Sequence, residues 1–167
     1  MASGDSLFTF EAIHGIPPSS TAAATPNRRG NDGHFVYDFG AATDTSLDAA
    51  YVMPRHYDGG GLTCVVMYMM ATATTNAVVL NLAFERHNDD AFDLDTDGLA
   101  AANAATDTVP NVSGELGYAT ITFTDGADMD SIAAGEHFRM RFTRDANNGS
   151  DTAAGDLQLV AIEVRET

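Results

Sequence analysis

The sequence lacks several features that would place it in a familiar class. Only one of its 167 residues is a cysteine. This excludes a disulfide scaffold, and the apolar segment around Cys64 predicts a small buried side chain there. No apolar run approaches the roughly 18 residues of a membrane span, and the N-terminus lacks the basic start and apolar core of a signal peptide. We therefore expect a protein that is made in the cytoplasm and has no membrane partner.

Lysine is absent as well, so all eight basic residues are arginines. Against 24 acidic residues they leave a formal net charge of −16. Nucleic-acid binding depends on basic side chains that neutralise phosphates, and this charge therefore excludes DNA and RNA as partners. A chain of this length most simply forms one domain with its own core.

Motifs for catalysis are missing too. The sequence contains no GxSxG motif and no phosphate-binding glycine loop followed by lysine. The histidines show no spacing typical of a metal site; they are His14, His34, His56, His87 and His137. Acidic pairs such as Asp89 with Asp90 could serve a glycosidase, but they arise by chance in so acidic a chain. The sequence thus predicts no enzyme, no catalytic residue and no cofactor.

One acidic motif has the spacing of calcium ligands. Asp93, Asp95 and Asp97 precede Gly98 in the pattern DxDxDG, which suits a hard cation bound by oxygen atoms. A complete calcium loop also needs a glutamate at its twelfth position, which is Ala104 here. We interpret the motif as a solvated acidic loop, with a calcium loop as the alternative. It belongs to a long segment, residues 89–110, of a kind that is often functional.

Two long apolar segments, residues 62–70 and 77–86, dominate the pattern and predict two strands joined by a turn as a central hairpin. In the second, the apolar residues alternate as in a half-buried strand. The first is apolar on both faces, because Val65, Met67 and Met69 lie opposite the inward side chains. That second face must be covered either by another part of the chain or by another subunit.

Further alternating segments predict short strands with turns between them. They are residues 7–10, 34–39, 49–53, 118–124, 137–143 and 157–165. The last segment changes phase near Leu159, which predicts a β-bulge. Seven or eight strands with almost no helix predict an all-β fold, an antiparallel β-sandwich of the jelly-roll type. We assign residues 34–167 to this domain.

Residues 1–33 have no clear period and contain two consecutive prolines, and we expect an extended N-terminal arm. The arm is either a flexible leader or a segment that becomes ordered on a neighbouring subunit. Its candidate partner contacts are Phe8, Phe10, Ile13, Ile16, Arg28 and Arg29.

Arg139 and Arg141 lie two residues apart and share one face of a predicted strand. They either pair with acidic neighbours across the same sheet or contact another subunit through their planar guanidinium groups. The sequence favours neither option.

Three stretches, MPRHYDGGGLTCVVMYMMATATTNAVVLNLAFER, YATITFTDGADMDSIAAGEHFRMRFTRD and LVAIEVRET, resemble small jelly-roll virion proteins of tailed bacteriophages, of the head decoration or cement type. The similarity covers about residues 35–167. It implies a structural protein, a homotrimer on the outer capsid surface of the virion, with the major capsid protein as partner. Such a protein would stabilise the assembled head by binding it.

The alternative function is a receptor- or glycan-binding jelly-roll module of a phage tail fibre or baseplate, because jelly rolls also serve as lectins. Its site would use exposed aromatic residues such as Tyr57 and Tyr118 beside the acidic loop at residues 89–97.

Overall fold

The computed structural model describes residues 4–19 and 22–167, and within these ranges the chain forms ten β-strands and two 3-10 turns. The strands are β1 (Ser6–Glu11), β2 (Thr25–Arg29), β3 (His34–Phe39), β4 (Thr45–Val52), β5 (Leu62–Met70), β6 (Ala77–His87), β7 (Asn103–Thr108), β8 (Gly117–Phe123), β9 (His137–Arg144) and β10 (Leu157–Glu166). The turns are η1 (Ala12–His14) and η2 (Ala127–Met129). No helix in the described part of the chain is long and apolar enough to cross a membrane.

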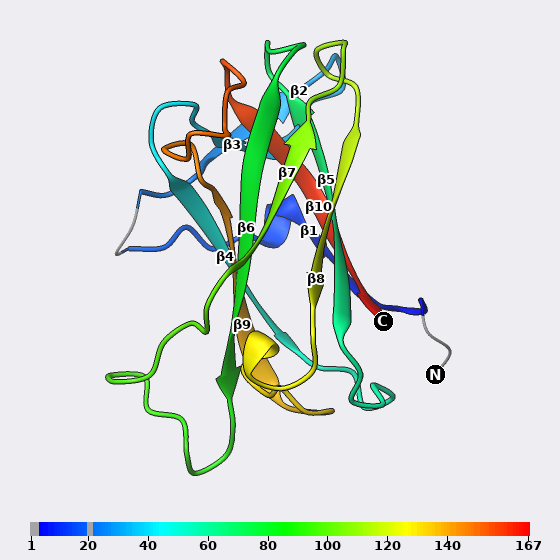
Figure 1. The fold of residues 1–167 in the computed structure, drawn as a ribbon, viewed down its shortest axis with the longest axis vertical. Coiled ribbons are helices and arrows are strands. Elements are labelled where there is room, and N and C mark those ends of the chain that lie inside the picture. Colours follow the sequence, from blue (N-terminus) through cyan, green and yellow to red (C-terminus); the bar gives the residue numbers. More distant parts are fainter. Residues whose placement is uncertain (1–3, 20–21) are drawn as a thin grey trace.

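The strands form two antiparallel sheets that pack face to face as a jelly-roll β-sandwich (Figure 1), which confirms the predicted fold class. The first sheet has the order β2-β3-β10-β5-β8, with β1 also paired to β10. The second sheet has the order β4-β9-β6-β7. The loop that follows β6 extends beyond the end of the sandwich in Figure 1.

The central hairpin predicted from the sequence is wrong. β5 pairs with β10 and β8 in the first sheet, whereas β6 pairs with β9 and β7 in the second. The turn between them carries the chain from one layer to the other, with Asn76 at a φ of 77°. Alternation in each strand determines which side chains point inward, and it is equally compatible with two strands that face each other across the core.

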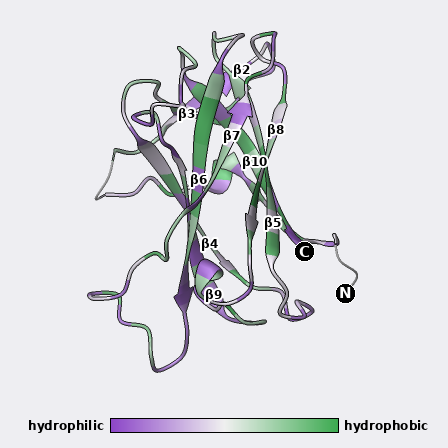
Figure 2. Cartoon of the chain, viewed as in Figure 1, coloured by the Kyte–Doolittle hydropathy of each residue, from purple (hydrophilic) through white to green (hydrophobic). Residues whose placement is uncertain are grey.

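The core lies between the sheets and contains the inward side chains of the alternating strands together with residues of the turns, such as Met129 and Ile132. Figure 2 shows hydrophobic residues along β5 and much of β6. Val78, Leu80, Leu82 and Phe84 of β6 are fully buried there. Phe84 packs edge-to-face on Phe123, with ring centroids 4.8 Å apart. Cys64 is buried in the same core, as predicted, and burial raises the pKa of its thiol.

The end of the chain contains the predicted β-bulge. The register of β10 against β5 shifts between Leu159 and Ala161. Leu157 and Leu159 before the shift, and Ile162 and Val164 after it, all reach the core. One additional residue in the strand thus reverses the alternation and keeps both halves apolar inward.

The boundary at residue 33 needs correction, because the N-terminal segment belongs to the sandwich. β1 pairs with β10, and β2 pairs with β3. The ring of Phe10 is 1% exposed. The strand predicted at residues 7–10 corresponds to β1, but β1 pairs within the sandwich and is not part of a separate arm. β2 was not predicted, because it contains Pro26 and two arginines and lacks the alternation that marks a strand in sequence. Predictions for residues 1–3, 20 and 21 lie outside the described residues.

Candidate functional site

A pocket of about 290 Å³ lies where the loop after β6 meets the turn before β9. We call it the loop pocket; its lining residues are Arg86, Asn88, Phe92, Asp97, Gly98, Asp130 and Ser131. Five of these side chains carry hydrogen-bonding groups and one is an aromatic ring. The loop is attached to the second sheet by the backbone N–H of Ala100, which donates to the carbonyl of Phe84 at 2.8 Å.

The wall of the loop pocket beside β6 is held by ion pairs and hydrogen bonds. The Arg86 guanidinium makes a two-pronged contact with Glu136, Nε to Oε2 at 2.6 Å and Nη2 to Oε1 at 2.5 Å. This contact lowers the pKa of Glu136 and raises the pKa of Arg86. The backbone N–H of Arg86 donates to Asp130 Oδ2 at 2.6 Å. Asp130 and the next residue, Ser131, have φ values of 56° and 55°, a conformation that is unusual away from glycine.

Part of the lining comes from the DxDxDG motif, which forms a turn held by its own carboxylates. Asp97 Oδ2 accepts a hydrogen bond from the backbone N–H of Asp93 at 2.7 Å, and Asp93 Oδ1 accepts one from Asp95 N–H at 3.0 Å. Among residues 4–19 and 22–167, no three acidic, histidine or cysteine side chains form a group that could hold a metal ion. Two residues of the motif, Asp97 and Gly98, line the loop pocket.

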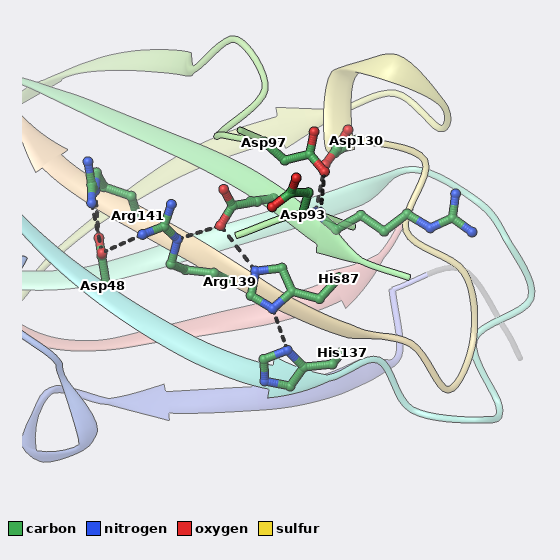
Figure 3. Close-up of polar contacts among 10 residues, drawn as sticks. Asp48, His87, Asp93, Asp97, Asp130, His137, Arg139 and Arg141 are labelled. Atoms are coloured by element: carbon green, nitrogen blue, oxygen red, sulfur yellow. Dashed lines mark hydrogen bonds and ion pairs between the residues drawn. The ribbon is translucent and has the colours of Figure 1, made fainter. Parts of the chain in front are cut away.

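Phe92 links this pocket to the outer face of the second sheet, where its ring stacks on the imidazole of His87 at a centroid distance of 4.0 Å. On that face a line of polar side chains crosses three strands (Figure 3). We call it the charged row; its members are Asp48, Glu85, His87, His137, Arg139 and Arg141.

The charged row shows that Arg139 and Arg141 pair within their own sheet. Arg141 binds Asp48 with Nε to Oδ1 at 2.6 Å and Nη2 to Oδ2 at 2.8 Å, and this contact raises the pKa of Arg141. Arg139 lies between two carboxylates, with its Nε 2.7 Å from Glu85 Oε2 and its Nη1 3.4 Å from Asp48 Oδ2. Of the two options left open by the sequence, the intramolecular pairing is the one observed.

The aromatic residues expected in an N-terminal arm pack against or within the core of the sandwich: Phe8 is partly buried and Phe10 is buried. Phe8 stacks on Tyr51 at 5.0 Å and lies 5.7 Å from the Phe138 ring. Phe10 is buried beside the same tyrosine. Ile13 and Ile16 are 58% and 55% exposed and are the members of this group that present apolar surface.

The adjacent arginines of the predicted arm also contact their own domain. Arg28 lies over the Phe35 ring at 5.8 Å and donates to the carbonyl of Gly33. Arg29 donates to Gln158 Oε1 at 2.5 Å and to Ser113 Oγ at 2.8 Å.

The second apolar face of β5 is covered mostly by the chain itself. Val65 is 9% exposed and Met69 is 8% exposed, while Met67 is half-buried. In the sheet, Met67 lies between Ala161 of β10 and Tyr118 of β8. Because this burial needs no second chain, the apolar face does not require an oligomer.

Neither of the two tyrosines expected at a glycan site lines the loop pocket. Tyr57 is 4% exposed, and its hydroxyl donates to the carbonyl of Gly60. Burial raises its pKa to about 12. Tyr118 is 58% exposed, but it lies at the start of β8, opposite the end of β5 and so at the other end of the sandwich from the loop after β6.

The sequence indicated the acidic segment but not its partners in the loop pocket. Asp130 and Ser131 lie more than thirty residues after Gly98, in a turn without a recognisable motif. The left-handed conformation of these two residues gives no signal in sequence, since neither is glycine.

Comparisons with known proteins agree with the fold. No known protein family and no curated protein matches the sequence. Among solved structures, the chain is similar to an Arthrobacter globiformis isomalto-dextranase complexed with panose, with a TM-score of 0.57 and 16% identity over 93% of this chain. The chain spans 22% of that enzyme's length.

Two matches extend over whole domains. A family 35 carbohydrate-binding module from Clostridium thermocellum has a TM-score of 0.56 at 9% identity, and the match covers 96% of this chain and 98% of that one. A xylan-binding domain of family 22 from Paenibacillus barcinonensis has a TM-score of 0.56 at 13% identity, with 96% and 99% covered. At these identities the similarity establishes the jelly-roll fold, and the fold alone does not establish a function.

Proposed function

We propose that this chain is a carbohydrate-binding module and that it binds a neutral sugar in the loop pocket. The observation that carries the proposal is the composition of the pocket, whose lining combines five polar side chains with one aromatic ring. Its volume of about 290 Å³ lies near the lower end of the range for small-molecule pockets, about 300–1,000 Å³. Such a pocket suits one or two sugar rings.

The chemistry of a sugar matches these side chains. A pyranose ring presents apolar C–H groups on its faces and hydroxyl groups around its rim. The C–H groups pack against an aromatic face, which Phe92 supplies. The hydroxyl groups need both hydrogen-bond donors and hydrogen-bond acceptors. Asn88 and Ser131 supply donors, and the carboxylates of Asp97 and Asp130 accept hydrogen bonds.

The negative charge of the protein limits the class of glycan that we propose as its ligand. The protein carries a net charge of −16, and two carboxylates line the loop pocket. The one guanidinium in the lining is already paired with Glu136. Anionic polysaccharides would be repelled by this field, so neutral glycans are the proposed ligands.

Binding without cleavage is proposed because both pocket carboxylates act as hydrogen-bond acceptors. Asp97 accepts from the N–H of Asp93, and Asp130 accepts from the N–H of Arg86. A glycosidase needs two carboxyl groups, one of which donates a proton to the leaving oxygen. The solved structures with this fold that match over their whole length include carbohydrate-binding modules, which supports a binding role.

The proposal is tested by affinity electrophoresis in gels that contain neutral or anionic polysaccharides, followed by calorimetry with oligosaccharides of any polysaccharide that retards the protein. We expect dissociation constants of about 0.1–1 mM for a single shallow site, equivalent to about 4–5.5 kcal/mol. Phe92→Ala should weaken binding at least about tenfold, because it removes the aromatic contact. The matched control is Tyr118→Ala, which removes an exposed ring at the other end of the sandwich. Equal weakening by both variants would refute the assignment of the pocket.

The capsid-decoration hypothesis, with its homotrimer and its major capsid protein partner, stays a prediction. The residues proposed for its contacts are mainly engaged within the domain, as Phe10 and Arg141 illustrate.

A further inference from the structure

We propose that His87 and His137 form a binding site for a divalent transition-metal ion, which adjoins the loop pocket through Phe92 but does not rest on the proposed glycan binding. The two residues are 50 positions apart in the sequence but occupy directly opposed positions on β6 and β9. Their Nδ1 atoms are 2.7 Å apart (Figure 3). Once the shared proton has left, an ion beside this contact and about 2.0 Å from each nitrogen would be bound by both imidazoles.

The tautomer of His87 is suited to such an ion. Its Nε2 lies 3.1 Å from Glu85 Oε2, and since a carboxylate only accepts, Nε2 carries the proton. The Nδ1 atom of His87 therefore presents its lone pair towards His137. A metal-binding histidine commonly donates its other ring N–H to a carboxylate, which orients the ring and increases its basicity.

The supporting groups are rigid. The Glu85 side chain is 4% exposed, and the Arg139 guanidinium holds its Oε2 at 2.7 Å. The Phe92 ring closes one face of His87 at a centroid distance of 4.0 Å. A site whose ligand is fixed before binding loses less conformational freedom when the ion arrives.

Charge does not oppose a cation here. Within the charged row, Asp48 and Glu85 balance the two arginines, Arg139 and Arg141. On the β4 side, the residue opposite His137 is the uncharged Val52.

The ligand set determines which ions fit. Imidazole nitrogen suits copper, nickel and zinc, whereas magnesium and calcium prefer oxygen ligands. His137 is exposed, so water can complete the coordination of the ion. The expected order of affinity is copper(II) above nickel(II) and zinc(II), with no binding of magnesium or calcium.

The test is calorimetric titration of the untagged full chain with copper(II), nickel(II), zinc(II) and magnesium chlorides at pH 7.5. We expect one transition-metal ion per chain in the stated order. His137→Gln should weaken binding at least about tenfold, while His56→Gln, at an exposed histidine outside the pair, should leave it unchanged. Thermal unfolding of each variant without metal shows whether the fold is intact.

A second variant and a second measurement distinguish the site from adventitious binding. Glu85→Gln keeps the shape of the side chain, and we expect it to weaken metal binding about 10–100-fold. With nickel(II), the imidazole nuclear magnetic resonance signals of His87 and His137 should broaden before those of His14, His34 and His56. Equal affinity of His137→Gln and the wild-type chain, or broadening that begins at another histidine, would overturn the proposal.

Discussion

A buried ion pair provides the most demanding test of how this sandwich is held together. Arg144 is fully buried near the end of β9, and its guanidinium pairs with Asp151, which is 1% exposed. All five N–H groups of Arg144 have partners: Asp151 accepts two at 3.0 and 2.8 Å, and the carbonyls of Phe39, Ala153 and Gly155 accept the others. This one side chain therefore links β3 and β9 to the loop that precedes β10.

The perturbation is Asp151→Asn, which keeps the shape of the side chain but removes its charge and turns an N–H group towards the guanidinium. The arginine would remain buried without its counter-charge, which costs about 3–5 kcal/mol of unfolding free energy. At an m-value of about 2 kcal/mol per molar urea, the unfolding midpoint should fall by about 2 M. The assay is equilibrium unfolding in urea followed by circular dichroism.

Two comparisons make this result specific. Arg144→Met combined with Asp151→Leu should lose less stability than the sum of the two single variants, because no unpaired charge stays buried. Arg165→Met should have a much smaller effect, since that side chain is 41% exposed beside Glu163. A loss below about 1 kcal/mol for Asp151→Asn, or additive losses in the double variant, would refute the reasoning.

Three further predictions concern backbone packing, the N-terminal segment and pH. Gly61→Ala should lower the free energy of unfolding in urea by about 1–3 kcal/mol, because a Cβ at this position would lie 2.4 Å from a carbonyl oxygen of β8. The control is Gly60→Ala, where the nearest atom would lie 3.4 Å from the Cβ, and it should lose less stability. Equal losses in the two variants would contradict this prediction. Phe10→Ala should lower the free energy of unfolding by about 3–5 kcal/mol in the same assay, because the ring is buried in the core. An unchanged unfolding midpoint would instead indicate that the N-terminal segment is an arm outside the core. The lowered pKa of Glu136 beside Arg86 contributes stability that is present above the unfolded-state pKa and is lost as the pH falls through the folded-state pKa. Thermal unfolding between pH 7 and pH 3 should therefore show a smaller loss for Glu136→Gln than for the wild type, and parallel curves would argue against this contribution.

Most of the fold was predictable because alternation in a strand directly reflects burial. The inward faces of β6, β8 and β9 follow from side chains such as Leu82, Ile121 and Met140, and the bulge in β10 follows from its change of phase. Alternation carries no information about strand partners. For this reason β5 and β6 were predicted to pair with each other, although they lie in opposite sheets.

The strands that the sequence did not predict, β7 and β2, lack an alternation of apolar and polar residues. β7 reads NAATDT, an edge strand with small and polar side chains, and its residues fell within the long loop expected after β6. β2 reads TPNRR and also lies at a sheet edge. An edge strand is held by backbone hydrogen bonds to one neighbouring strand, and its side chains can stay exposed to solvent. Its residues therefore need not be apolar.

The candidate site was predictable only in part. The acidic motif pointed to the loop that contains Asp97, because three aspartates and a glycine form a recognisable turn. Asp130 and the contact between His87 and His137 could not be associated with it, since they depend on the approach of β9 and of the turn before β9 to β6. Contacts between distant segments are a property of topology, which the local sequence does not encode.

The most direct test of the central claim is nuclear magnetic resonance mapping of a neutral oligosaccharide titrated into the isotopically labelled chain. Binding in the loop pocket predicts that the largest backbone amide shifts occur at residues 86–98 and 130–131, and that Phe92→Ala abolishes them at the same ligand concentration. Shifts centred on Tyr118 or elsewhere on the first sheet would place the glycan site outside the loop pocket. The absence of shifts with every neutral oligosaccharide tested would contradict the proposed function itself.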